Sequence, residues 1–182
     1  PRLSAASLLA RLGGSLADAL RPGDLLVLND AATLPASLAG RTGSGEAIEV
    51  RLAGEREDGT FAAVLFGAGD WRRRTEDRPA PPALAPGETV TFGDGLVGTV
   101  REVSDASPRL VTLRFDRTGA ALWSALYTVG RPVQYSYLER ELSLWDVQTA
   151  YAARPWAVEP PSAGLGLSAA LLDALLRGGV RI

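Results

Sequence analysis

The sequence predicts an α/β fold into which a small antiparallel β-barrel is inserted. Residues 38–115 alternate apolar and polar side chains with a period of two and are broken by glycine-containing turns, a pattern typical of short antiparallel strands. The flanking parts show helical spacing and one continuous apolar run, which is typical of an α/β layer. We therefore expect an α/β domain formed by residues 1–37 and 116–182, and a barrel domain formed by residues 38–115.

The N-terminal part predicts a helix over residues 4–20. Leucines recur at every fourth position from Leu8 to Leu20, and Ser4 can cap the helix. The pair Gly13-Gly14 favours a break, so two shorter helices remain an alternative.

The next apolar run, residues 25–28, predicts a strand buried on both faces. Such a strand needs cover that only residues after 116 can supply, so we expect residues 20–37 to contact residues 130–170. Asn29 and Asp30 would follow at the carboxyl end of the strand, where open α/β sheets bind ligands. The alternative is a turn in which these side chains bond their own backbone.

The barrel strands follow from local patterns. The turns Asp58-Gly59 and Gly93-Asp94-Gly95 each separate two apolar runs, as expected for hairpins. The strand candidates are residues 47–52, 60–66, 88–92, 96–100 and 110–115.

Residues 70–86 predict a long loop, because four prolines disfavour both helix and strand. The loop contains Trp71 and the cationic cluster Arg72, Arg73 and Arg74, which could bind RNA by charge and by stacking. The alternative, a solvated loop, is favoured because Glu76 and Asp77 dilute the charge.

Helical spacing returns over residues 116–128 and leads into a segment rich in polar and aromatic groups, residues 130–149. Gly130 permits a turn, and Pro132 should hold Arg131 extended with its guanidinium free to reach an anion. Composition alone favours a plainer interpretation: an edge strand with Tyr135 and Tyr137 on one face, followed by a core tryptophan. Near the C-terminus, residues 168–177 predict a helix that ends at Gly178-Gly179.

Composition excludes several kinds of chemistry. The chain has no Cys, His or Met, and all 19 of its basic residues are arginine. Disulfides, thiolate or imidazole metal sites and Cys, His or Lys nucleophiles are therefore excluded within it, and we expect no metal. A net charge of −2 argues against a surface that binds nucleic acid all over. Without an apolar run long enough for a membrane span or a leader pattern, we expect a cytoplasmic location and no membrane partner.

Two segments resemble a known family. GRPVQYSYLERELSLWDVQTAYA, residues 130–152, together with residues 159–164 (EPPSAG), is similar to the central motif of the S-adenosylmethionine:tRNA ribosyltransferase-isomerases of queuosine biosynthesis. LRPGDLLVLNDAATLPASL, residues 20–38, resembles the first motif of the same family. The resemblance also implies a β-barrel inserted into an α/β domain, and it covers about the first half of a family member.

The resemblance implies an enzyme that transfers the ribosyl part of S-adenosylmethionine to 7-aminomethyl-7-deazaguanine in tRNA and isomerises it. S-adenosylmethionine would be the co-substrate and tRNA the partner. The substrate-binding residues expected by motif are Asn29, Asp30, Arg131, Gln134, Tyr135, Gln148, Thr149, Ser162 and Gly164. We expect these groups to converge on one concave site.

The chain departs from the family pattern at Ala32, Ser37 and Gly166, where the family usually has Arg, Arg and His. Because no Met begins the sequence, it also reads as a piece of a longer protein. These departures leave a second hypothesis, a non-catalytic binding module for a small ligand or RNA. The sequence leaves oligomeric state and individual catalytic roles open.

Overall fold

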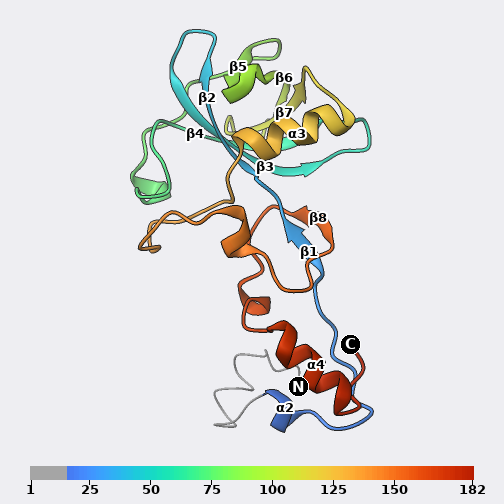
Figure 1. Ribbon diagram of the computed structural model, residues 1–182. Coiled ribbons are helices and arrows are strands. Elements are labelled where there is room, and N and C mark those ends of the chain that lie inside the picture. Colours follow the sequence, from blue (N-terminus) through green and yellow to red (C-terminus); the bar gives the residue numbers. More distant parts are fainter. Residues whose placement is uncertain (1–15) are drawn as a thin grey trace.

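A computed structural model describes residues 16–182 of the chain. Three parts follow one another along an elongated molecule: a barrel at one end, a small parallel sheet in the middle and a helical base at the other end (Figure 1). The helix expected over residues 4–20 lies mostly outside the described residues. Its last part is α2 (Leu16–Ala19).

Six antiparallel strands form a closed barrel, which confirms the expected α/β fold with a small barrel. Their order is β2-β3-β4-β7-β6-β5, and pairing of β5 with β2 closes the circle. The expected turns at Asp58-Gly59 and residues 93–95 connect β3 to β4 and β5 to β6. The strands are β2 (Ser37–Thr42), β3 (Ala47–Glu55), β4 (Phe61–Phe66), β5 (Thr89–Phe92), β6 (Val97–Val103) and β7 (Leu110–Phe115).

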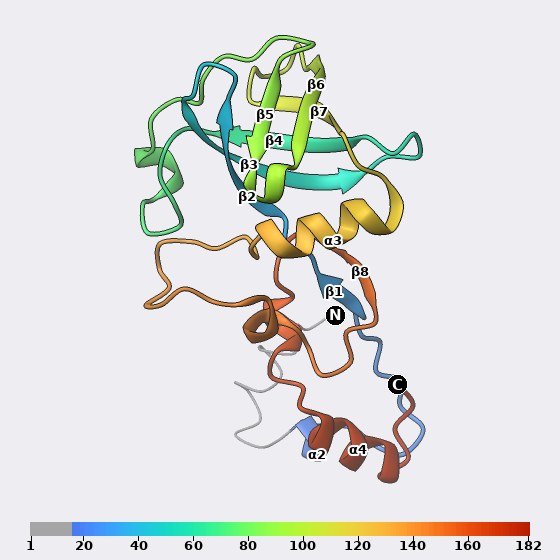
Figure 2. The ribbon, with the colours of Figure 1, turned by 45° about the horizontal axis from the view of Figure 1, so that its top comes forward.

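Alternating side chains fill the barrel. In β4, Phe61, Ala63 and Leu65 are almost fully buried, while Ala62 and Val64 between them are half-buried. Phe61 packs edge-to-face against Phe115 of β7, with ring centroids 5.4 Å apart. Helix α3 (Gly119–Val129) lies along the side of the barrel that faces the sheet (Figure 2), and its Trp123 ring contacts Phe61.

The middle of the molecule is a two-stranded parallel sheet of β1 (Ala31–Thr33) and β8 (Arg154–Ala157). Residues 20–37 therefore do contact residues 130–170, as we expected. Further links between the two segments are the hydrogen bonds exchanged by the backbones of Ser37 and Arg131. The division into two domains at residues 37–38 and 115–116 stays a prediction.

The base consists of α2 and α4 (Ala169–Arg177), packed around Leu16, Leu175 and Val180. Ser168 caps α4 by accepting a hydrogen bond from Leu171 N, 3.2 Å away, so this helix begins and ends as predicted. Among residues 16–182, no helix has the length and apolar character needed to cross a membrane.

The expected buried strand at residues 25–28 was wrong. This segment makes a single parallel bridge, between Leu25 and Arg181, and the side chains of Leu25 and Val27 are 60% and 80% exposed. Leu26, on the other face, is half-buried against the cluster of the base, so within residues 16–182 the run is covered on one face and not on both. Asn29 and Asp30 consequently precede strand β1 rather than end a strand.

Candidate functional site

The predicted motif, residues 130–149, runs from the end of α3 past the barrel to the parallel sheet. Gly130 has an ordinary φ of −83°, so the turn itself does not require glycine. Glycine is needed there for another reason: a Cβ would lie 2.3 Å from the carbonyl oxygen of Pro35 and 2.7 Å from that of Leu126. This close approach fixes where the motif leaves the barrel.

The motif does not form the edge strand and core tryptophan that its composition alone favoured. Tyr135 and Tyr137 do share a face, with rings stacked 5.9 Å apart, but they lie in a turn and not in a strand. Trp145 is 85% exposed and is no core residue. It lies in the 3₁₀ turn η3 (Leu144–Val147), where Ser143 and Asp146 form a capping box. Hydrogen bonds from Arg140 and Ser143 hold the pKa of Asp146 below its usual range.

The first hollow along the motif, which we call the tryptophan hollow, lies where the barrel meets the motif. Its cavity volume is about 250 Å³. Trp71 and Arg72 line it from the loop after β4, and Arg131 and Gln134 line it from the motif. The structure therefore brings two of the predicted RNA-binding residues and two of the predicted substrate-binding residues to one place. Other lining residues are Ser37, Glu49, Asp70 and Glu141.

A buried ion cluster supports this hollow. Glu49 on β3 accepts hydrogen bonds from Ser37 Oγ at 2.8 Å, from Arg51 Nε at 2.6 Å and from Arg78. Arg78 also donates to the carbonyl oxygens of Gly67 and Gly69 and so attaches the tryptophan-bearing loop to the barrel. Burial raises the pKa of Glu49, but its arginine and serine partners outweigh burial and bring the pKa below the usual value.

The rim of the tryptophan hollow carries a bridge between loop and motif. Glu141 Oε1 is 3.1 Å from Arg131 Nε, and Glu141 Oε2 is 3.9 Å from Arg72 Nη2. The other two arginines of the cluster lie apart from it: Arg74 pairs with Glu76, and Arg73 is exposed. The loop is otherwise irregular apart from the 3₁₀ turn η1 (Thr75–Asp77).

The second hollow, the tyrosine hollow, has a cavity volume of about 230 Å³. Gln134, Tyr135 and Ser162 line it together with Glu159. The hydroxyl of Tyr135 donates a hydrogen bond to Glu159. Burial, followed by this hydrogen bond, raises the pKa of Tyr135 to about 12, so the phenol is neutral at physiological pH. Gln134 itself is held by its Oε1, which accepts a hydrogen bond from Leu142 N at 2.6 Å.

A third hollow, of about 310 Å³ and mostly apolar, is lined by Asn29, Ser162 and Gly164. Ser162 and Gly164 begin and end the 3₁₀ turn η4 (Ser162–Gly164). A Cβ on Gly164 would lie 2.4 Å from Tyr151 Oη, so glycine is needed for the close packing of this turn. Gln134 links the first hollow to the second, and Ser162 links the second to the third.

Three predicted residues, Asp30, Gln148 and Thr149, line none of these hollows, and Asn29, which lines the third, also bonds within the fold. The amide of Gln148 bonds the backbone of Thr33, and the hydroxyl of Thr149 is buried with no hydrogen-bond partner among residues 16–182. Asn29 Oδ1 accepts a hydrogen bond from Ala31 N at 3.0 Å, as the alternative interpretation of this residue required. Asp30 lies 3.4 Å from Arg154 Nε, and its carbonyl oxygen accepts hydrogen bonds from Ala153 N and Arg154 N.

Six of the nine predicted residues therefore lie along a row of adjoining hollows, and the nine do not gather in a single hollow. Sequence reasoning missed the carboxylates in this row, among them Glu49, Glu141 and Glu159. Glu141 and Glu159 lie within the motif segments, whereas nothing local distinguishes Glu49 from an outward-facing strand residue. In the described residues, no group of three or more Asp or Glu side chains could hold a metal ion.

Comparison with known proteins decides the family. The sequence model of a family described as "Queuosine biosynthesis protein" matches residues 8–182. This chain belongs to that family. Its similarity to family members extends over most of its own length.

Among relatives, the S-adenosylmethionine:tRNA ribosyltransferase-isomerase of Rhodospirillum rubrum is 39% identical over 92% of this chain and 45% of its own length. That of Methylocella silvestris is 38% identical over 100% of this chain and 49% of its own length. A solved S-adenosylmethionine tRNA ribosyltransferase from Thermotoga maritima, 20% identical, aligns with a TM-score of 0.35 over 91% of this chain and 41% of that one. The chain thus spans about half the length of the curated relatives that it matches.

Proposed function

We propose that this chain supplies the barrel-bearing half of a tRNA-modifying enzyme of queuosine biosynthesis. The enzyme transfers the ribosyl part of S-adenosylmethionine to 7-aminomethyl-7-deazaguanine in tRNA and isomerises it. The observation that carries the proposal is the family match over residues 8–182, which includes both motif segments. The identities of 39% and 38% to enzymes named for this activity support it.

The row of hollows supports a role in binding two substrates. The tryptophan hollow has cations at its rim and an aromatic ring in its wall, as suits a nucleotide of an RNA strand. The tyrosine hollow has apolar walls with the Tyr135 and Glu159 pair inside, as suits a small organic ligand. We assign tRNA to the first hollow and S-adenosylmethionine to the second.

Ser37 and Gly166, which stand where the family usually has Arg and His, are compatible with this proposal. Ser37 donates its hydroxyl to Glu49, so it takes part in the buried cluster below the tryptophan hollow. A Cβ on Gly166 would meet nothing within 4 Å, so a larger side chain could occupy that position. A Gly166→His variant therefore tests whether the usual histidine raises activity.

The proposal is tested by incubating the protein encoded by the full reading frame, and separately this chain, with S-adenosylmethionine and tRNA that carries the deazaguanine. Mass spectrometry of digested tRNA should detect epoxyqueuosine, with adenine and methionine released. Arg131→Ala and Tyr135→Phe should reduce product formation, and Arg114→Ala, an exposed barrel arginine, is the control. If neither protein forms product but tRNA or S-adenosylmethionine still binds, the chain is a binding module and the enzyme proposal fails.

A further inference from the structure

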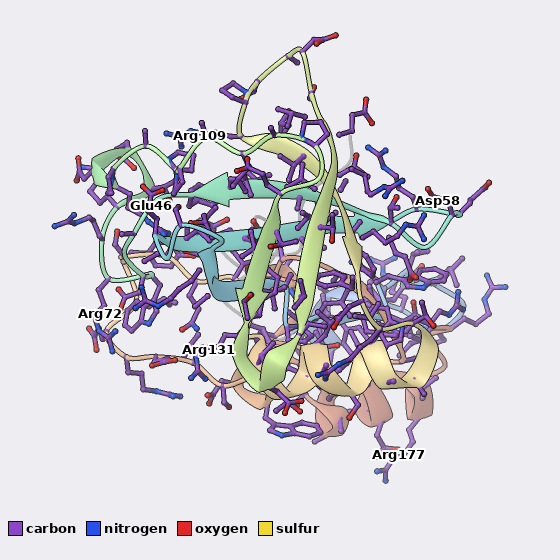
Figure 3. The ribbon with its side chains drawn as sticks, turned by 90° about the horizontal axis from the view of Figure 1, so that it is seen from above. Glu46, Asp58, Arg72, Arg109, Arg131 and Arg177 are labelled. Atoms are coloured by element: carbon purple, nitrogen blue, oxygen red, sulfur yellow. The ribbon has the colours of Figure 1, made fainter. Side chains whose placement is uncertain are left out.

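Two arginines far apart in sequence meet on one carboxylate at the rim of the tryptophan hollow. Arg72 comes from the loop between β4 and β5, and Arg131 comes from the motif after α3. Each approaches a different oxygen of Glu141, at 3.9 Å and 3.1 Å. Seen from above, the labelled Arg72 and Arg131 lie on the same side of the molecule, across from Asp58 (Figure 3).

Other contacts position the side chain of Arg72 and the backbone of Arg131, whereas the side chain of Glu141 has none of this kind within residues 16–182. Arg72 Nη1 pairs with Asp70 at 2.6 Å, and its guanidinium stacks on the Trp71 ring, 4.7 Å from the centroid. The backbone of Arg131 is bonded in both directions to Ser37. For the side chain of Glu141, the two arginines are the partners found within residues 16–182. One guanidinium held by its neighbours and a second one carried on a fixed backbone thus share one loosely held carboxylate.

Such a bridge is easily replaced. All three side chains are exposed, by 41% for Glu141 and more for the arginines, and exposed ion pairs contribute little to stability. A phosphodiester of an RNA backbone presents two non-bridging oxygens in a similar arrangement and carries one negative charge, as a carboxylate does, and arginine binds phosphate with paired hydrogen bonds. Glu141 can turn into solvent when a phosphate takes its place.

We infer that Arg72 and Arg131 form a clamp for a backbone phosphate of RNA, and that Glu141 holds the position of this phosphate when RNA is absent. The inference rests on the proposed function, because that function supplies the RNA. RNA is favoured over a free nucleotide because the clamp stands beside the Trp71 ring and Gln134, which would face a neighbouring base. Glu141 is therefore a competitor of RNA within the site.

The experiment measures binding of a labelled anticodon stem-loop RNA by fluorescence anisotropy over a range of salt concentrations. Glu141→Gln should tighten binding about two- to fivefold, because it removes the competing charge. Arg72→Ala and Arg131→Ala should each weaken binding and reduce the slope of log K against log salt by about one. In the Arg72→Ala, Arg131→Ala background, Glu141→Gln should have no effect on affinity.

Asp58 and Arg114 provide a matched control, since they form an exposed ion pair of 3.7 Å on the barrel away from the clamp. Asp58→Asn and Arg114→Ala should leave RNA affinity and its salt slope unchanged. The clamp proposal is wrong if Glu141→Gln fails to tighten RNA binding, or if Arg72→Ala changes RNA affinity no more than Arg114→Ala does. It is also wrong if adenosine monophosphate binds and its affinity changes with these variants as predicted for RNA, while the affinity for RNA does not. If epoxyqueuosine is formed but the variants do not change RNA affinity as predicted, only the clamp proposal fails. If the variants change RNA affinity as predicted but no epoxyqueuosine is formed, only the enzyme proposal fails.

Discussion

The side-chain amide of Gln148 makes both hydrogen bonds that a neighbouring strand would make with Thr33. Thr33 N donates to Gln148 Oε1 at 2.9 Å, and Gln148 Nε2 donates to Thr33 O at 2.8 Å. Thr33 is fully buried, and β8 pairs with the other edge of β1. The amide therefore completes the hydrogen bonding of the short strand β1 and joins the motif to the parallel sheet.

Gln148→Ala should destabilise the protein by about 1–3 kcal/mol, because it leaves a buried backbone donor and acceptor unpaired. Urea unfolding followed by circular dichroism measures the change. Ser162→Ala is the control, since the exposed serine makes one long hydrogen bond of 3.5 Å, and its stability should change by less than about 0.5 kcal/mol. Equal unfolding midpoints for the two variants would contradict the strand role of Gln148.

The barrel could be predicted from the sequence because its signals are local. Alternation and turn residues place β3, β4 and the β5–β6 hairpin within a few residues of their true ends. The sheet of β1 and β8 could not be predicted in the same way. Its strands have three and four residues and lie more than 100 residues apart, and a glutamine side chain, not a third strand, bonds the other edge of β1.

The motif singled out residues that line hollows, but their arrangement could not be predicted, and their role in binding stays a prediction. Arg131, Gln134 and Tyr135 each pair with a residue eight or more positions away, at Glu141, Leu142 and Glu159. The Glu49 cluster is the clearest case, because Arg78 is 29 positions away and reaches it through an irregular loop. At residues 25–28 the apolar run predicted burial on both faces, but within residues 16–182 the run packs through Leu26 on one face and leaves Leu25 and Val27 exposed.

Glu49→Gln should destabilise the chain by about 3–5 kcal/mol, because Arg51 and Arg78 would be left buried without a carboxylate. Glu46→Gln, an exposed change on the adjacent β2–β3 turn, should alter stability by less than about 0.5 kcal/mol. Denaturant unfolding at pH 7 compares the two. A small effect of Glu49→Gln would mean that the arginines find other partners.

The same cluster predicts a pH dependence. Because the folded-state pKa of Glu49 lies below the unfolded value, its stabilisation is present above the unfolded pKa of about 4.3 and is lost as pH falls. The difference in unfolding free energy between wild type and Glu49→Gln should therefore shrink as pH is lowered below about 4.3. A difference that stays constant down to the acid transition would exclude the charge as its cause.

The phenol of Tyr135 should ionise at a higher pH than that of an ordinary tyrosine. The difference in phenolate absorbance between wild type and Tyr135→Phe should develop near pH 12 in the folded protein and near the ordinary value of about 10 in urea. The raised pKa implies a stabilisation that is fully present below pH 10 and is lost as pH rises toward 12. Glu159→Gln should lower the pKa of Tyr135 but leave it above about 10, because burial remains.

Gly130→Ala tests the junction between barrel and motif. The added Cβ would lie 2.3 Å from Pro35 O and 2.7 Å from Leu126 O, and both are backbone atoms that cannot turn away as a side chain can. We expect a loss of about 2 kcal/mol or more in unfolding free energy, since overpacking of this kind shifts the backbone. Gly43→Ala is the matched control, because its Cβ would meet nothing within 4 Å and its φ is not in the left-handed region. If Gly130→Ala is as stable as Gly43→Ala, the junction is free to move.

Because Arg131 follows Gly130 directly, Gly130→Ala should also weaken RNA binding at the clamp. An unchanged RNA affinity would mean that the packing of the junction does not determine the position of Arg131.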